Sequence, residues 1–112
     1  MLVDQVTNIL FICGKNKLRS PTAEAIFSSW QNIEADCAGV NADADTVVSQ
    51  EQVRWSDMIF VMEDSHRIKL ARKFPTDLKG KRVVCLNIPD KFQYMQPDLI
   101  RMLEAIVGKY LR

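Results

Sequence analysis

The chain has 112 residues, of which 47% are apolar and 26% charged, and this composition is typical of one ordinary globular domain and excludes a disordered chain. Fifteen basic and fourteen acidic residues leave a net charge of +1, so nothing indicates a nucleic-acid partner or an anionic membrane surface. The longest apolar runs, such as residues 9–13, are too short to cross a bilayer. We therefore expect a single domain over residues 1–112 that binds neither nucleic acid nor membrane.

The first half of the chain alternates between strand and helix patterns. Residues 5–13 form a nearly continuous apolar and β-branched run, which predicts a strand buried on both faces. A polar stretch follows, and residues 20–30 predict a helix with Ser20 as its cap and a proline in its first turn. Residues 33–38 predict a short second strand, and residues 49–56 a short helix that begins with a capping box.

The second half repeats this alternation. Residues 57–62 predict a third strand, residues 65–74 a basic helix, residues 81–88 a fourth strand and residues 97–111 a closing amphipathic helix. Such an alternation predicts an α/β fold in which a four-stranded parallel sheet carries helices on both faces. Ligands of these sheets bind beyond the carboxyl ends of the strands, so we expect the function to lie in the loops that follow them.

The three cysteines, Cys13, Cys37 and Cys85, show no CxxC spacing. They therefore predict neither a disulfide framework nor a structural zinc site. The first residues also lack the cationic and apolar pattern of a secretion signal, so we expect a protein of the reducing cytoplasm. The sequence around Cys37 and Cys85 is typical of thiols in or near the core, so Cys13 is the candidate for a reactive cysteine.

The loop after the first strand, residues 13–20, has the sequence CGKNKLRS. A cysteine and an arginine six positions apart are weak evidence alone. Here, however, they flank a short polar loop whose N–H groups can form an anion-binding nest, beside the partial positive charge of a helix N-terminus. That setting favours a thiolate at Cys13, and the planar guanidinium of Arg19 suits two phosphate oxygens. The pattern indicates a site for a tetrahedral dianion beside a nucleophile.

The run ILFICGKNKLRSPTAEAIF, residues 9–27, resembles the signature of the low-molecular-weight protein tyrosine phosphatase family. That signature is a cysteine, five residues and Arg-Ser-Pro-x-Ala-Glu after a hydrophobic strand. Three further stretches resemble family segments in the same order: residues 36–39, residues 55–62 followed by His66, and residues 88–92. The chain is a short variant, about 110 residues long, with less sequence between Gly39 and Val48 than typical members have. The resemblance implies a four-stranded parallel sheet flanked by helices.

The resemblance also implies a phosphomonoester hydrolase of the protein tyrosine phosphatase type. Cys13 would attack phosphorus and become a phosphocysteine, Arg19 and the loop amides would bind the equatorial oxygens, and Asp90 would serve as general acid and then as general base. Ser20 would donate to the Cys13 thiolate. The other implied residues are Gly14, Lys15, Asn16, Lys17 and Leu18 around the phosphate, Phe92 as an aromatic wall of the pocket, and His66 as a support of the loop together with Asn16.

The same resemblance implies a phosphotyrosine protein or a small aryl phosphate as substrate, no metal or cofactor, and a monomer or weak dimer. Lys15 and Lys17 depart from the family pattern, which has glycine and an apolar residue at these positions. We expect the two lysines and Arg19 to give the site three positive charges that attract acidic substrates, unless both lysines simply face solvent. For His66, the alternative to loop support is a helix-capping role.

Two other functions stay open. The same fold and loop can support arsenate reduction, but Cys37 and Cys85 do not form the nearby downstream pair that resolves an arseno-cysteine. A catalytically weak phosphate-binding regulatory module would use the loop without turnover. The presence of both Cys13 and Asp90 argues against that second alternative.

Overall fold

The computed structural model describes residues 5–111 as one four-stranded sheet with helices packed on it. The strands are β1 (Thr7–Cys13), β2 (Ile33–Gly39), β3 (Met58–Val61) and β4 (Arg82–Cys85). The helices are α1 (Arg19–Phe27), α2 (Gln50–Trp55), α3 (Asp64–Lys73) and α4 (Pro97–Val107), followed by the 3-10 turn η1 (Gly108–Tyr110). Within residues 5–111, none of these helices has the length and hydropathy needed to span a membrane.

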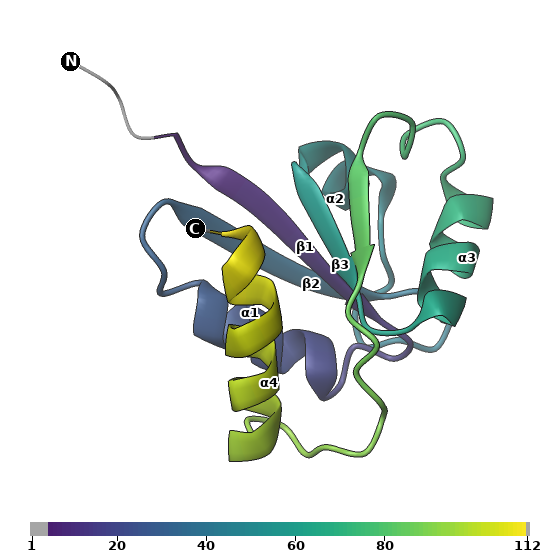
Figure 1. Cartoon of the computed structure of the whole chain (residues 1–112). Helices are drawn as coiled ribbons and strands as arrows, with labels where there is room; N and C mark the ends of the chain where they lie inside the picture. The colour runs from purple at the N-terminus through teal and green to yellow at the C-terminus, as the bar shows by residue number, and fades with distance from the viewer. Residues whose placement is uncertain (1–4, 112) are drawn as a thin grey trace.

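All neighbouring strands run parallel in the order β2-β1-β3-β4. The apolar side chains of α1 and α4 pack on one face of the sheet, and those of α2 and α3 pack on the other (Figure 1). The predicted α/β architecture, a four-stranded parallel sheet with helices on both faces, is confirmed. From β1 the chain crosses to β2 on one side and then to β3 on the other, which creates the topological switch point where ligands of such sheets bind.

The central strand β1 explains why its sequence is an unbroken apolar run. Ile9 and Phe11 face α1 and α4, Leu10 and Ile12 face α2 and α3, and all four are fully buried. The ring of Phe11 stacks between two other phenylalanine rings, with centroids 5.6 Å apart in each pair. Burial of a side chain of this size stabilises the fold by about 1.5–3 kcal/mol. The strand is thereby a rigid support for the loop that leaves its carboxyl end.

Several element boundaries differ from the expected ones, for physical reasons. Helix α1 begins at Arg19, and Ser20 does not cap it because its hydroxyl bonds to other groups of the site. Strand β4 is shorter than predicted because Asn87 takes a left-handed φ of 56°, which most residues avoid, so the extended backbone does not continue through it to residue 88. The expected capping box at the start of α2, formed by Ser49 and Gln52, is present.

Candidate active site

The nucleophile candidate, Cys13, is the last residue of β1, and its thiol is nearly inaccessible to solvent. The loop after it folds back over the sulfur, so that the N–H of Asn16 donates to Sγ over 3.1 Å. Ser20 Oγ donates to Asn16 Oδ1 over 2.9 Å and lies 2.9 Å from Sγ, so the same hydroxyl can turn to donate a hydrogen bond to the sulfur when Cys13 is a thiolate. Donors thus converge on the sulfur from the loop and from the start of α1.

Two residues permit the tight turn of this loop. Asn16 has a φ of 58°, a left-handed conformation that asparagine tolerates better than most residues. Gly39, at the end of β2, lies so close to the loop that a Cβ there would stand 2.5 Å from the carbonyl oxygen of Gly14. Any larger residue at position 39 would push the loop out of place.

Arg19 is almost completely buried, and protein acceptors fix its orientation. Its Nη1 donates to Glu63 Oε2 over 2.6 Å and to the carbonyl oxygen of Ile88 over 2.7 Å. Among residues 5–111, no group accepts a hydrogen bond from Nε or Nη2, and Asp90 Oδ1 lies 3.8 Å from Nε. The Nε and Nη2 edge is therefore available to bind two oxygens of an anion.

Glu63, which holds this arginine, was not among the residues expected from the sequence. It is also the N-cap of α3, where its side chain accepts the N–H of His66 and its own N–H donates to His66 Nδ1 over 3.1 Å. The pattern Glu-x-x-His before a helix could have indicated this capping box. One carboxylate thus connects the start of α3 to the guanidinium of Arg19.

His66 serves mainly this capping box. Burial, and then the positive charge of Arg19, lower the pKa of His66, so the ring is neutral near pH 7. Because Nδ1 accepts a hydrogen bond, the proton of the neutral ring is on Nε2. His66 makes no bond to Asn16, so these two residues do not form the expected joint network. Nε2 instead lies 3.6 Å from where a Cβ on Gly14 would stand.

A cavity of about 190 Å³ opens above the sulfur, and its lining residues are Cys13, Lys15, Lys17, Leu18, Arg19, Asn41 and Asp90. Asp90 lies in the loop after β4 with its carboxylate exposed at the rim. The structure therefore brings Cys13, Arg19 and Asp90 to one pocket, as the sequence predicted, although they come from three different segments. Asn41 joins them from the loop after β2 and was not expected.

Phe92 does not line this pocket. Its side chain is only 6% exposed and belongs to the apolar core on the α1 and α4 face of the sheet. The expectation that Phe92 forms an aromatic wall is therefore wrong, because the ring gains more from burial in the core than from a place at the rim.

The two loop lysines are paired with carboxylates. Lys17 Nζ donates to Asp45 Oδ1 over 2.7 Å, which raises the pKa of Lys17, and Lys15 Nζ lies 3.6 Å from Asp43 Oδ2. Because Arg19 is itself paired with Glu63, all three positive charges have acidic partners, and the expectation that they together attract acidic substrates is wrong. The partners of the two lysines lie in the 41–46 segment, which follows β2 at the same edge of the sheet as the loop.

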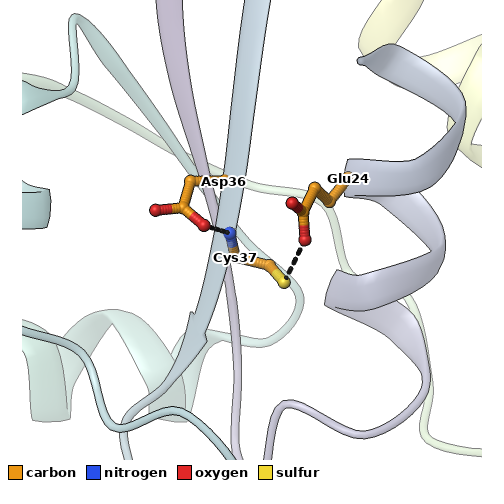
Figure 2. Close-up of side chains that lie close together, drawn as sticks. All are labelled: Glu24, Asp36 and Cys37. Atoms are coloured by element: carbon orange, nitrogen blue, oxygen red, sulfur yellow. Dashed lines mark hydrogen bonds between the residues drawn. The ribbon is translucent and has the colours of Figure 1, made fainter. Parts of the chain in front are cut away.

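A second group of polar side chains surrounds Cys37 on β2 (Figure 2). Its thiol donates to Glu24 Oε1 over 2.8 Å, and burial together with the negative charge of Glu24 raises the pKa of Cys37. Asp36 lies on the other side of the strand from Glu24, where it accepts the N–H of Cys37 over 2.8 Å and the amide of Gln52 over 3.0 Å. Protein groups satisfy this cluster, and its thiol is held in the protonated form.

No protein-family model matches the chain, and no curated protein matches its sequence. Solved structures do match. The tyrosine phosphatase Wzb from Escherichia coli K30, in complex with phosphate, aligns with a TM-score of 0.75 at 21% identity, over 95% of this chain and 96% of that one. The YwlE arginine phosphatase from Geobacillus stearothermophilus aligns with a TM-score of 0.74 at 19% identity, over 94% and 93%.

A third structure is a low-molecular-weight phosphotyrosine phosphatase from Vibrio cholerae O395, with a TM-score of 0.68 at 19% identity, over 95% of this chain and 97% of that one. The 112-residue chain therefore has the fold of the low-molecular-weight phosphatases. The sequence resemblance and the structural comparison thus agree on the architecture, and at these identities the comparison shows the fold alone.

Proposed function

We propose that this protein is a cysteine-dependent phosphomonoesterase of the protein tyrosine phosphatase type. The observation that carries the proposal is the arrangement around one sulfur: the Asn16 N–H and the Ser20 hydroxyl lie at Cys13 Sγ, and the open edge of Arg19 faces the same pocket. These groups together stabilise a thiolate and bind a phosphoryl dianion beside it. Similar folds named as tyrosine and arginine phosphatases support the proposal.

The reaction would proceed in two displacements. The Cys13 thiolate attacks phosphorus, the bond to the ester oxygen breaks, and Asp90 gives its proton to the departing alcohol or phenol. The product is a phosphocysteine. Asp90, now a carboxylate, takes a proton from a water that attacks phosphorus, and the phosphorus–sulfur bond breaks to release inorganic phosphate and the thiolate.

Arg19 and the loop amides would hold the three equatorial oxygens throughout both steps. Because Nη1 is already bound to Glu63 and Ile88, Arg19 needs little reorganisation to present Nε and Nη2. The protein groups supply the positive field themselves, so the proposed mechanism uses no metal. We extend the proposal to a monomeric or weakly dimeric cytoplasmic enzyme whose substrate is a phosphotyrosine protein or a small aryl phosphate.

The arsenate reductase alternative gains no support from the thiols. Cys37 is hydrogen-bonded to Glu24, and Cys85 donates to Asn87 at the end of β4. Cys37 and Cys85 lie on the two opposite edge strands of the sheet, so they do not form a neighbouring thiol pair that could resolve an arseno-cysteine.

The test is hydrolysis of 4-nitrophenyl phosphate by the wild type, Cys13→Ser and Cys37→Ser. We expect Cys13→Ser to lose at least about 10⁴-fold in kcat, because the nucleophile is removed. The matched control Cys37→Ser should keep most of the activity, because that thiol lies outside the pocket. A wild type that binds phosphate but hydrolyses no phosphomonoester would instead favour the regulatory module.

The role of Asp90 is tested with leaving groups of different basicity. Asp90→Asn should slow the release of poor leaving groups by about 10²–10⁴ and that of activated phenols much less. A phosphocysteine peptide, trapped by acid and detected by mass spectrometry, would identify the intermediate directly. A small, uniform effect across leaving groups would show that Asp90 is not the general acid.

A further inference from the structure

Asn41 lines the pocket, and the proposed mechanism does not use it. Its backbone N–H donates to the carbonyl oxygen of Gly14 over 3.0 Å, and that of Val40 donates to the carbonyl oxygen of Cys13 over 3.0 Å. The residue is therefore tied by its main chain to the two positions where the nucleophile loop begins. Its backbone therefore has a fixed place relative to the sulfur.

Lys69, on α3, decides which way the Asn41 amide points. Its ammonium group donates to Asn41 Oδ1 over 2.9 Å. An ammonium can only donate, so the amide oxygen must face Lys69 and the amide nitrogen must turn the other way. Nδ2 accordingly lies 3.2 Å from where a Cβ on Gly14 would stand. Among residues 5–111, no group accepts a hydrogen bond from Nδ2, so two N–H donors are available at the pocket wall.

The rest of the pocket shows what these donors can bind. The loop amides and the open edge of Arg19 already provide for the phosphoryl oxygens. Asn41 comes from a different segment and lines the same pocket, so its amide can reach a part of the substrate other than the phosphoryl oxygens. The pocket wall contains no aromatic side chain within the described part of the chain, and Leu18 is its one aliphatic residue. A polar donor at an otherwise non-aromatic wall favours a leaving group with an oxygen acceptor.

We propose that Asn41 is a substrate-binding residue that donates a hydrogen bond to an oxygen on the leaving group, and that Lys69 is its positioning residue. The inference rests on the proposed phosphatase function and narrows its substrate class. Preferred substrates are phosphomonoesters whose alcohol or phenol carries a hydroxyl, ether or carbonyl oxygen close to the ester, in contrast to those with a bare ring.

The test uses pairs of substrates that differ in one acceptor. Methoxyphenyl and ethylphenyl phosphates, each substituted at position 2, 3 or 4, match in size and closely in leaving-group basicity, and only the methoxy group accepts a hydrogen bond. The wild type should prefer the methoxy compound by about three- to tenfold in kcat/KM for at least one position, which is the worth of one hydrogen bond. Asn41→Leu should abolish this preference, and Asn41→Asp, which keeps an acceptor for Lys69 but has no donor, should abolish it as well.

Lys69→Met should reduce the preference because the amide is free to rotate, and Lys69→Arg should restore part of it. Lys73→Met, an exposed change of the same charge on the same helix, is the control and should leave the preference unchanged. The inhibition constant of inorganic phosphate should stay the same in all variants, since phosphate has no leaving group.

The outcomes distinguish the proposed role of Asn41 from the proposed phosphatase function. A wild type without the preference, or an Asn41→Leu enzyme that retains it, overturns the inference while the phosphatase function stands. Weaker phosphate inhibition in Asn41→Leu, matching its loss in kcat/KM, also overturns it, because Asn41 would then support the phosphoryl site. A wild type that hydrolyses none of the compounds overturns the proposed function itself, and the inference with it.

Discussion

Cys13 and Cys37 lie on adjacent strands, both are buried, and both face the same side of the sheet. In the register of β1 and β2, Phe11 is paired with Cys37 and Cys13 with Gly39, so the two cysteines are two positions apart. Their hydrogen bonds nevertheless have opposite directions. Cys13 Sγ receives an N–H from Asn16, whereas Cys37 Sγ gives its proton to Glu24. Burial alone therefore does not determine how a thiol behaves.

One helix creates this difference. Ser20, in the first turn of α1, lies against Cys13, and Glu24, one turn later on the same face, lies against Cys37. The helix N-terminus also adds partial positive charge near Cys13, and this effect is small beyond the first turn. The same side of α1 thus places a hydroxyl against one cysteine and, against the other, a carboxylate that opposes its ionisation.

Alkylation tests the difference between the two cysteines most directly. At about pH 6, iodoacetate should modify Cys13 at least about 100-fold faster than Cys37, because only the former is held by donors. Peptide mass spectrometry after timed quenching measures both rates in one sample. Phosphate or vanadate should protect Cys13 alone. Faster modification of Cys37, or no protection by either anion, would contradict the assignment of the nucleophile.

Removal of one donor at Cys13 should reduce the difference in reactivity between the two cysteines. Ser20→Ala should slow both the alkylation of Cys13 at about pH 6 and kcat by about tenfold, which corresponds to one hydrogen bond to a charged sulfur. Ser28→Ala, an exposed change at the end of α1, is the control. If both serine variants behave like the wild type, the short contact between Ser20 and Cys13 does not matter for reactivity.

The fold could be predicted because the strands are buried on both faces and leave unbroken apolar runs, as in β1. The place of Cys13 and Arg19 followed from the same reasoning, since the loop between a strand and a helix in such a sheet lies at its binding edge. Glu63 and Asn41 were missed because their roles depend on partners far away in the chain. The direction of Phe92 was misjudged because no periodicity in a loop distinguishes a core-facing ring from a pocket-facing one.

Glu24, which accepts the hydrogen bond from the Cys37 thiol, can be changed as well. Glu24→Gln should lower the pKa of Cys37, because the negative charge that opposes its ionisation is gone, and should speed its alkylation at about pH 9 roughly three- to tenfold. The rate at Cys13 should hardly change. The control is Glu34→Gln, which removes an exposed carboxylate from β2, the strand that carries Cys37. Equal rates at Cys37 in all three proteins would mean that burial alone keeps this thiol protonated.

The smallest expected effect is on stability at alkaline pH. In the unfolded chain Cys37 ionises near a pKa of about 8.5, whereas in the folded protein burial and Glu24 raise the pKa, so the folded state keeps this proton longer. The free energy of unfolding should therefore fall as the pH rises above about 8.5. Cys37→Ala removes this contribution, so its melting temperature should decline less steeply than that of the wild type between about pH 8 and pH 10.

His66 provides an internal reference for that measurement. Its pKa is lowered in the folded state, so its contribution to stability is present above about pH 6.5 and is lost as the pH falls below that value. Cys37→Ala should leave this acidic limb of the stability curve unchanged and flatten only the alkaline limb. Since the substitution also removes packing, the slopes of melting temperature against pH are compared and not the temperatures themselves. Identical alkaline slopes in the two proteins would show that the folded state does not hold the Cys37 proton, and the contrast between the two cysteines would then depend on Cys13 alone.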